Sequence, residues 1–390
     1  MPDRSSPTAQ DNATLELLCD SVTRLVDEVL IPAEAQCDAQ GLVPEPIVQQ
    51  MRDFGLFGLS VPEEFGGLGL TMSDEARVIA ALCRASPSYR SLIGTTVGVG
   101  GKSIVLDGTD AQRQRYLPSI ARGETVVSFC LTEPDSGSDA GALRTRAERV
   151  ADGYLINGQK RFISNAPMAG LFLVMARTKA GSKGASNNAI SAFLVDADTP
   201  GITISPPWKK MGHRGAAVAD VSFVDCLVPQ DALLGAVEGQ GFATAKKVLN
   251  DGRIHVAAVA VGLATRLMEE SVSYATQRYQ FGQALSDFQL IQGMLADGET
   301  DLLAAQALLT QTAAARDAGE RVVKQAAAAK YFATEALWRI ADRAVQIHGG
   351  YGYMADSAVE RLFRDARLLR IFEGTSQVMQ VVIAREMLRA

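Results

Sequence analysis

The sequence is poor in the residues that build metal sites and disulfide frameworks. Its three histidines, His213, His255 and His348, lie far apart in the chain, so we expect no metal site. Its five cysteines are scattered and odd in number, which argues against a Cys-based metal site and against a set of disulfides. Unpaired cysteines are typical of a reducing compartment, so this pattern favours a cytoplasmic protein.

Three further absences exclude other classes of protein. No run of about eighteen apolar residues occurs, so we expect no membrane-spanning helix. The net charge of −6 leaves no basic excess for nucleic acid or for an acidic membrane surface. The chain begins Met-Pro-Asp-Arg-Ser-Ser-Pro, without a charged segment followed by an apolar one, so no secretory signal is expected. These absences predict a protein that works away from membranes and nucleic acids.

The 390 residues are enough for two or three domains, and the pattern of apolar residues changes twice along the chain. Helical spacing in 1–123 predicts a helical domain. Short apolar runs between turn signals in 124–235 predict an antiparallel β domain. The remainder, 236–390, is expected to form a bundle of long helices, so the fold class is α+β with several domains. The bundle contains three long stretches without proline, 242–278, 286–318 and 321–347.

Individual positions predict where some of these elements begin and end. Asp152-Gly153 and Asn157-Gly158 are each typical of the tight turn of a β-hairpin. Ser73, followed by two acidic residues, predicts the start of a helix. The stretch from Gly181 to Asn188 is predicted to be a flexible surface loop, because glycine, serine and asparagine dominate it.

The segment Arg370–Gln377 reads Arg-Ile-Phe-Glu-Gly-Thr-Ser-Gln and places one acid, Glu373, between apolar residues and a glycine. Thr375 or Ser376 can cap the helix that is predicted to follow, and the field at a helix start favours an ionised carboxylate. Two interpretations are open at this point. Glu373 is either an acid on a surface turn, which is the commoner case for this spacing, or a base that takes a proton from carbon.

Four other segments carry polar and glycine-rich patterns that are weak evidence when taken singly, because most such segments are turns or helix ends. Together with the Glu373 segment, their identity, order and spacing resemble the acyl-CoA dehydrogenase family over nearly the whole chain. The five segments are Leu-Thr-Glu-Pro-x-Ser-Gly-Ser-Asp at 131–139, Asn-Gly-x-Lys-Arg-Phe-Ile-Ser-Asn at 157–165, Arg-x-x-Phe-Gly at 278–282, Gln-Ile-His-Gly-Gly-x-Gly at 346–352 and Ile-Phe-Glu-Gly-Thr-Ser-Gln at 371–377.

The resemblance implies an N-terminal helical domain, a central antiparallel β domain and a C-terminal four-helix bundle, usually assembled as a homotetramer. It also implies FAD between the β domain and the bundle, with part of its site supplied by a neighbouring subunit. Thr132 and Ser164 would hydrogen-bond the flavin ring, and Arg278 would pair with the pyrophosphate of the neighbour's FAD. The implied cofactor-binding residues are Phe129, Leu131, Thr132, Ser138, Phe162, Ile163, Ser164, Arg278, Phe281, Gln289, Gln346, Ile347, Gly349, Gly350, Thr375, Ser376 and Gln377.

The reaction implied by the resemblance is the dehydrogenation of an acyl-CoA thioester. Glu373 would be the catalytic base that removes the α-proton, while a hydride leaves the β-carbon for FAD, giving a trans-2-enoyl-CoA. The electrons would then pass to an electron-transfer flavoprotein as partner. The implied substrate-binding residues are Ser138, Asn250, Asp251, Arg253 and Gly374.

Alternatives stay open within the same fold. The stretch Ser88-Tyr-Arg-Ser91 resembles the segment with which glutaryl-CoA dehydrogenases hold the distal carboxylate of their substrate, so Arg90 would bind a dicarboxyl-CoA. A buried, unpaired arginine would disfavour plain alkyl chains, whereas an Arg90 that faces solvent or a neighbouring helix would remove this alternative. Other members of the fold use oxidase or reductive chemistry, or act on an acyl group bound to a carrier protein. A protein that binds FAD without turnover is disfavoured by the presence of Glu373 and Arg278.

Overall fold

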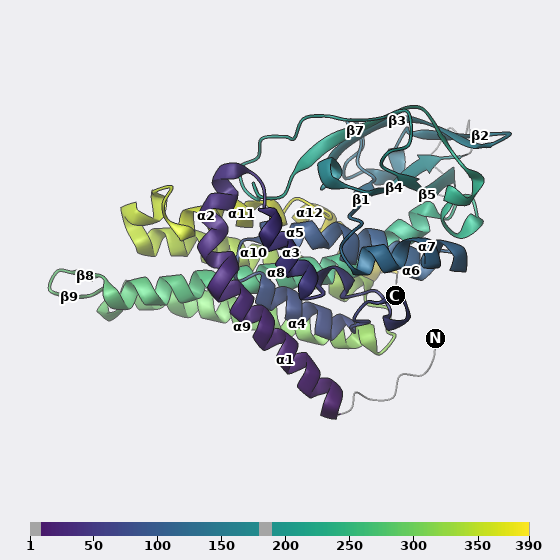
Figure 1. Cartoon of the computed structure of the whole chain (residues 1–390). Helices are drawn as coiled ribbons and strands as arrows, with labels where there is room; N and C mark the ends of the chain where they lie inside the picture. The colour runs from purple at the N-terminus through teal and green to yellow at the C-terminus, as the bar shows by residue number, and fades with distance from the viewer. Residues whose placement is uncertain (1–8, 179–188, 390) are drawn as a thin grey trace.

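The computed structural model describes residues 9–178 and 189–389, so the predicted loop from Gly181 to Asn188 lies outside the described residues. Helices come first, a β-sheet follows, and long helices complete the chain (Figure 1). This order confirms the predicted fold class. Within the described ranges, no helix is both long and apolar enough to cross a membrane.

The N-terminal part is helical, as predicted. Its fourth helix begins two residues earlier than a cap at Ser73 would place it, because the Thr71 hydroxyl accepts the Asp74 N–H at the helix start. The last of these helices starts with a capping box that was not predicted, in which the side chains of Thr109 and Gln112 each hydrogen-bond the backbone N–H of the other residue. The helices are α1 (Ala9–Leu25), α2 (Ile31–Gln40), α3 (Glu45–Asp53), α4 (Met72–Leu82), α5 (Pro87–Gly94), α6 (Gly101–Asp107) and α7 (Asp110–Ala121).

The central part forms one seven-stranded sheet in the order β1-β4-β2-β3-β7-β6, with β5 paired to β4. Most pairings are antiparallel, but β4 runs parallel to β1 and β2. Six of the seven residues of β4 are buried, which is why its sequence is almost continuously apolar. The strands are β1 (Val127–Cys130), β2 (Arg146–Val150), β3 (Gly153–Ser164), β4 (Leu171–Arg177), β5 (Ile190–Asp196), β6 (Ile202–Ile204) and β7 (Val218–Val228).

One of the two predicted hairpin turns is wrong. Asp152-Gly153 does join β2 to β3, as the pairing of the residues beside it requires. Asn157-Gly158 instead lies inside β3, at a shift in its register against β7. Gly158 has a φ of +155°, and a Cβ there would lie 2.4 Å from the hydroxyl of Thr145. The glycine is therefore needed for a close approach of two segments and not for a turn.

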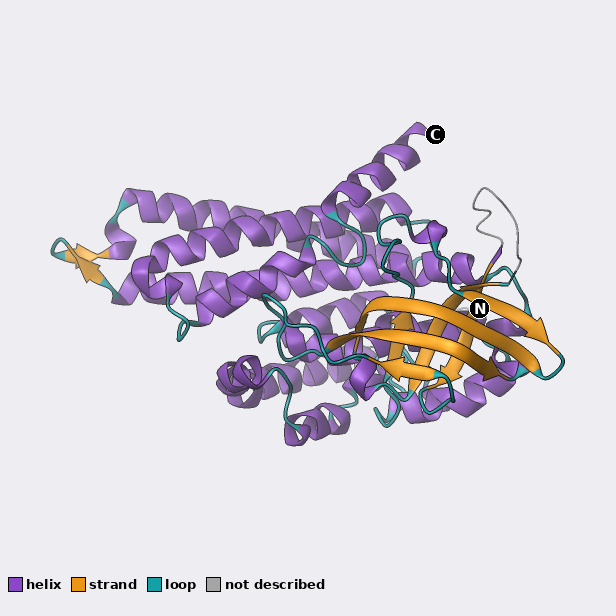
Figure 2. Cartoon of the chain, turned by 90° about the horizontal axis from the view of Figure 1, so that it is seen from above, coloured by secondary structure: helices purple, strands orange, loops and turns teal. Residues whose placement is uncertain are grey.

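The C-terminal part contains the three long helices predicted from the absence of proline. α10 packs against α8, α9 and α12, and α8 also packs against α9. In Figures 1 and 2 the β-sheet lies near one end of these helices, and a small β-hairpin lies at the other end. The elements are α8 (Gly241–Gln277), β8 (Tyr279–Gln280), β9 (Gln283–Ala284), α9 (Gln289–Asp317), α10 (Val323–His348), α11 (Ala358–Leu369) and α12 (Ser376–Leu388).

The N-terminal helices and the bundle share one apolar core. α4 packs against α8 and α9, and its Val78 and Ile79 are buried in the same cluster as Ala258 and Leu263 of α8. The sheet has a core of its own around residues such as Phe172. The helices therefore act as one block, and side chains at the boundary between this block and the sheet can be held precisely.

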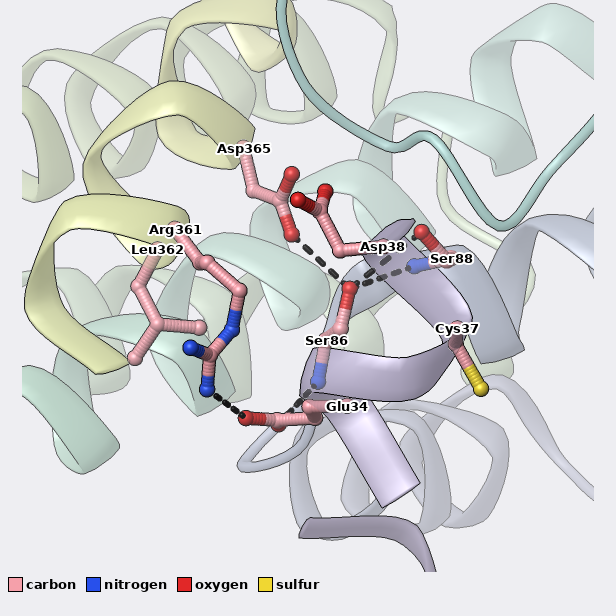
Figure 3. Close-up of a pocket in the computed structure, with 8 residues that line it drawn as sticks. All are labelled: Glu34, Cys37, Asp38, Ser86, Ser88, Arg361, Leu362 and Asp365. Atoms are coloured by element: carbon pink, nitrogen blue, oxygen red, sulfur yellow. Dashed lines mark hydrogen bonds and ion pairs between the residues drawn. The ribbon is translucent and has the colours of Figure 1, made fainter. Parts of the chain in front are cut away.

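A small polar cavity lies where α2, the start of α5 and α11 meet (Figure 3). One oxygen of Glu34 accepts the Ser86 N–H at 2.7 Å, and Oε2 lies 3.6 Å from Arg361. The Ser86 hydroxyl donates to Asp365 at 2.8 Å. Burial raises the pKa of Glu34 to about 7, although Arg266 and Arg361 act in the opposite direction.

We expect Glu34→Gln to stabilise the protein above pH 7. Between pH 4.5 and about 7 the folded state holds a proton on Glu34 that the unfolded state has lost, so stability falls as pH rises through this range. Above it, the ionised carboxylate costs on the order of 3 kcal/mol relative to a neutral group.

Urea unfolding at pH 4, 6 and 8 measures this difference. The control is Glu16→Gln, which removes an acid whose side chain is 60% exposed, and it should change the midpoint little at any pH. A gain for Glu34→Gln that is equal at all three pH values would contradict the expectation.

Candidate active site

The Glu373 segment forms a tight turn between α11 and α12. At the start of α12 the Thr375 hydroxyl accepts the Val378 N–H at 3.2 Å, which confirms the predicted helix cap at Thr375. Within the turn, Glu373 has a φ of +52° and Gly374 a φ of +97°. A non-glycine residue rarely adopts this left-handed conformation, so the surroundings must hold Glu373 in place.

The Glu373 side chain is largely buried between the N-terminal helices and the bundle. Its Oε1 lies 3.7 Å from Nη1 of Arg90 on α5, and the two side chains are 16% and 5% exposed. The possibility that Arg90 faces solvent is therefore wrong. On the other side, a Cβ at Gly252 of α8 would lie 2.3 Å from Oε2 of Glu373. In the described part of the chain this oxygen has no hydrogen-bond partner, so it is free to accept a proton from a bound molecule.

Two further cations stand near this carboxylate, Arg253 on α8 and Lys330 on α10. Burial lowers the pKa of Arg253, and the charge of Glu373 opposes this effect. Burial also lowers the pKa of Lys330 to about 8, again against the charge of Glu373. Among the described residues, Nε of Arg253 and Oδ1 of Asn250 are buried without a hydrogen-bond partner. Polar atoms that need a partner therefore gather around Glu373, as expected of a site for a polar ligand.

Two predicted substrate-binding residues have contrasting surroundings. Asp251 is only 2% exposed, and its oxygens accept two hydrogen bonds, at 2.7 and 3.1 Å, from Arg316 on α9. Ser138 lies exposed in the loop after β1. Contact of either residue with substrate stays a prediction, but the geometry gives Asp251 a structural task, which is to hold α8 to α9.

The two β-domain segments that were predicted to face the flavin lie side by side. The Arg161 N–H, near the end of β3, donates to the Thr132 carbonyl, just after β1, at 2.9 Å. Phe162 has a φ of +57°, is 57% exposed, and lies with its ring centroid 5.7 Å from that of Trp208. An open aromatic face beside backbone polar groups suits a flat conjugated ring. In these segments Leu131 and Ile163 are buried, and Phe129, Thr132 and Ser164 are partly exposed.

A buried ion pair that was not predicted shapes the loop between these segments. The Lys160 side chain is fully buried, and its Nζ donates to Glu133 at 2.8 Å and to the Leu131 carbonyl at 3.2 Å. Burial alone would raise the pKa of Glu133, but Lys160, the Thr145 hydroxyl and the Arg144 N–H together outweigh burial and hold that pKa below its ordinary value. Both residues lie inside quoted segments, so an acid and a lysine in neighbouring motifs were a signal available in the sequence.

Glu335 on α10 was also not predicted, and it fixes both sides of the Glu373 turn. Its carboxylate accepts the Arg370 side chain at 2.9 Å before the turn and the Ser376 hydroxyl at 2.6 Å after it. The hydroxyl of Ser376 is thus already engaged within the chain. Nothing local to the turn pointed to Glu335, because the contact spans about a tenth of the chain.

Comparison with known proteins identifies the family. Three family models match in succession: the acyl-CoA dehydrogenase N-terminal domain at residues 12–124, the middle domain at 128–226 and the C-terminal domain at 239–388. The chain belongs to the acyl-CoA dehydrogenase family. It is therefore an oxidoreductase, and the predicted family resemblance is confirmed.

Relatives cover almost the whole length of this chain. The caffeyl-CoA reductase-Etf complex subunit CarC of Acetobacterium woodii is 38% identical over 390 residues, which cover 98% of this chain and 96% of that protein. The structure of butyryl-CoA dehydrogenase from Megasphaera elsdenii matches with a TM-score of 0.92 and 33% identity, covering 99% of this chain and 100% of that one. A glutaryl-CoA dehydrogenase in complex with glutaryl-CoA matches with a TM-score of 0.92 and 31% identity, covering 99% and 97%.

The predicted cofactor residues of this family member fall into two groups that lie far apart. One group includes the β-domain segments and the start of α12, next to the Glu373 turn. The other lies around the β8–β9 hairpin at the far end of the long helices, where Tyr274 stacks on His348 at 4.3 Å (Figure 1). The stretch of α8 from Arg253 to Arg278 alone spans roughly 38 Å. The far group consists of Arg278, Phe281, Gln289, Gln346, Ile347, Gly349 and Gly350.

We expect Gly252→Ala to disable the site while leaving the fold intact. The added methyl group would come within 2.3 Å of the Glu373 carboxylate, which must move because the backbone of α8 cannot. A displacement of about 1 Å in a reacting group lowers the rate roughly 100-fold.

The matched control is Gly293→Ala on α9, where a Cβ would meet nothing within 4 Å. It should keep full activity and gain up to about 1 kcal/mol of stability from the better helix former. The two variants are compared by their rates of anaerobic flavin reduction and by their midpoints of thermal unfolding. Full activity in Gly252→Ala would show that Glu373 does not need its present position.

Proposed function

We propose that the protein dehydrogenates an acyl-CoA thioester between its α- and β-carbons. Glu373 removes the α-proton, and the product is a trans-2-enoyl-CoA. The observation that carries this proposal is the Glu373 carboxylate itself, which is largely buried and has one oxygen with no hydrogen-bond partner in the described chain. A base that acts on carbon needs such a position, shielded from water but open to the substrate.

The cations around Glu373 support the same step. An α-proton is far too weakly acidic for a carboxylate unless the negative charge that develops on the thioester oxygen is stabilised. Arg90 and Arg253 approach the carboxylate from two different helices, so positive charge surrounds the place where the thioester must lie. We assign Arg253 to substrate contact on this ground, Asn250 because its buried Oδ1 has no hydrogen-bond partner in the described chain, and Gly374 because it adjoins Glu373.

FAD is the cofactor that fits the site. The exposed ring of Phe162, beside the backbone of the segment after β1, offers one face to a flavin, and the start of α12 offers a second boundary. FAD held there would supply the acceptor for the hydride that leaves the β-carbon. The chain's residues then have to hold the thioester so that the α-carbon faces Glu373 and the β-carbon faces the flavin.

A second copy of the chain completes the cofactor site. One flavin beside Glu373 cannot also reach Arg278, which lies roughly 38 Å farther along α8. The far group of residues therefore serves the FAD of a neighbouring copy, and we propose a homotetramer of the kind implied by the family. Arg278 suits a pyrophosphate there, because a guanidinium can donate two hydrogen bonds to phosphate oxygens.

An electron-transfer flavoprotein is the proposed electron acceptor. The relative from Acetobacterium woodii is named as a subunit of a complex with such a protein, and it covers almost the whole chain. That relative is also named a reductase. The same base and cofactor can serve both directions, so reduction of the flavin by saturated thioesters is the test of the proposed direction.

We expect saturated acyl-CoA thioesters to bleach the flavin band of the purified protein under anaerobic conditions, with the ranking of chain lengths giving the preferred acyl group. Glu373→Gln should slow this bleaching by at least about 1,000-fold, because the amide cannot accept the proton. If Glu373→Gln bleaches as fast as the unchanged protein, Glu373 is not the base. A flavin that no saturated thioester reduces would reject dehydrogenation.

A dicarboxyl-CoA such as glutaryl-CoA is the second candidate substrate. It is favoured by the burial of Arg90 inside the site, and by the likeness to a glutaryl-CoA dehydrogenase bound to its substrate. Against it, Arg90 already has Glu373 as a charge partner at 3.7 Å. An acyl group bound to a carrier protein is a further substrate form that the thioester panel would miss.

We expect Arg90→Ala to slow flavin reduction by butyryl-CoA and by glutaryl-CoA to a similar degree, by roughly 10- to 100-fold. The reason is that Arg90 acts on Glu373 whichever acyl tail is bound. The rates of anaerobic flavin reduction with both thioesters test this. A loss of rate that is at least tenfold larger with glutaryl-CoA would favour the dicarboxylate substrate. The control is Arg77→Ala, on the exposed side of α4, which should change neither rate.

A further inference from the structure

Lys330, on α10, is a fully buried lysine that the proposed chemistry does not use. Its side chain has 0% exposure, and its Nζ donates a hydrogen bond to the Gly374 carbonyl at 2.7 Å. A buried ammonium group destabilises a protein by several kcal/mol unless charge and hydrogen bonds compensate for the lost water. Its place beside the Glu373 turn therefore calls for a local reason.

The backbone of the turn supplies one part of that reason. Glu373 and Gly374 have successive positive φ values, +52° and +97°, inside a turn that the Ser376 N–H closes by donating to the Arg370 carbonyl at 3.0 Å. Lys330 holds the Gly374 carbonyl, and Glu335, five residues later on the same helix, holds the side chains on both sides of the turn. α10 therefore carries a cation and an anion that together fix the turn from one side.

Charge supplies the other part. The strongest opposition to the effect of burial on Lys330 comes from Glu373, followed by Glu335, while Arg253 and Arg370 act with burial. The negative charge of Glu373 therefore stabilises the charged form of Lys330. Loss of the ammonium would remove a hydrogen bond from the turn and a positive charge from beside the base.

We propose that Lys330 is a positioning residue for the base Glu373. Its hydrogen bond to Gly374 keeps the Glu373 carboxylate over Gly252, and its charge keeps that carboxylate ionised and ready to accept a proton. This inference rests on the proposed function, in which Glu373 takes the α-proton.

The test compares Lys330→Met, which removes both the hydrogen bond and the charge, with Lys330→Gln, which keeps an N–H donor without charge. The rate of anaerobic flavin reduction by a reactive acyl-CoA is measured from pH 5 to 9, together with flavin content. We expect Lys330→Met to lose roughly 100-fold in maximal rate, with flavin retained, and the acid limb of its profile to move up by about one pH unit. At high pH, Lys330→Gln should be at least about tenfold faster than Lys330→Met. The acid limb of its pH profile should be shifted as in Lys330→Met.

Two controls separate the possible causes. Lys324→Met removes an exposed lysine from the first turns of the same helix and should leave both rate and profile unchanged. Glu373→Gln is assayed in the same series, so that a failure of the proposed base is seen independently of Lys330.

An unshifted acid limb in both Lys330 variants would overturn the proposal, whatever happens to the rate. A rate loss that only follows a loss of flavin or of folded protein would assign Lys330 a purely structural role and would also overturn it. If Lys330→Met does not fold, the profile of Lys330→Gln decides. If Glu373→Gln is fully active, the proposed function fails, and the proposal for Lys330 fails with it.

Discussion

The site depends on one buried carboxylate held among three cations from three helices. Arg90 comes from α5, Arg253 from α8 and Lys330 from α10, and Glu373 lies between them. Buried ion pairs of this kind contribute little to net stability, so the reason for the cluster must lie in its chemistry. In the proposed reaction, Glu373 loses its negative charge as the thioester oxygen gains one. The charge thus moves within the same group of cations, and little reorganisation is needed.

The long helix α8 separates the cluster around Glu373 from the predicted cofactor residue Arg278. α8 bears Gly252 and Arg253 near one end and Arg278 at the other, and as a single 37-residue helix it cannot fold back on itself. A run of buried alanines, including Ala257, Ala258 and Ala260, lets α8 pack closely against its neighbours and keeps its direction fixed. In the proposed function, the part of this rod beside Glu373 and its Arg278 end therefore belong to the sites of two different FAD molecules, which is why a second copy enters.

Much of the fold followed from the sequence, but the site only in part. Long stretches without proline predicted α8, α9 and α10, and Thr375 was predicted as a cap, because these signals act over a few residues. Asn157-Gly158 misled for the same reason: the dipeptide is a strong local turn signal, but the glycine serves a contact with Thr145. A local pattern cannot show whether a glycine is needed for its own conformation or for the space that it leaves to a distant residue.

The residues that place Glu373 lie beyond the reach of any local pattern. The motif around Glu373 points to the proposed base, but Arg90, Gly252 and Lys330 come from three other parts of the chain, and nothing in the sequence indicated that Gly252 or Lys330 would lie against Glu373. This limits what the resemblance at Arg90 can say about substrate. One guanidinium has five N–H donors, so Arg90 can hold Glu373 and still bind a distal carboxylate. A buried Arg90 is therefore required by the base alone, and its presence does not by itself select a dicarboxyl-CoA.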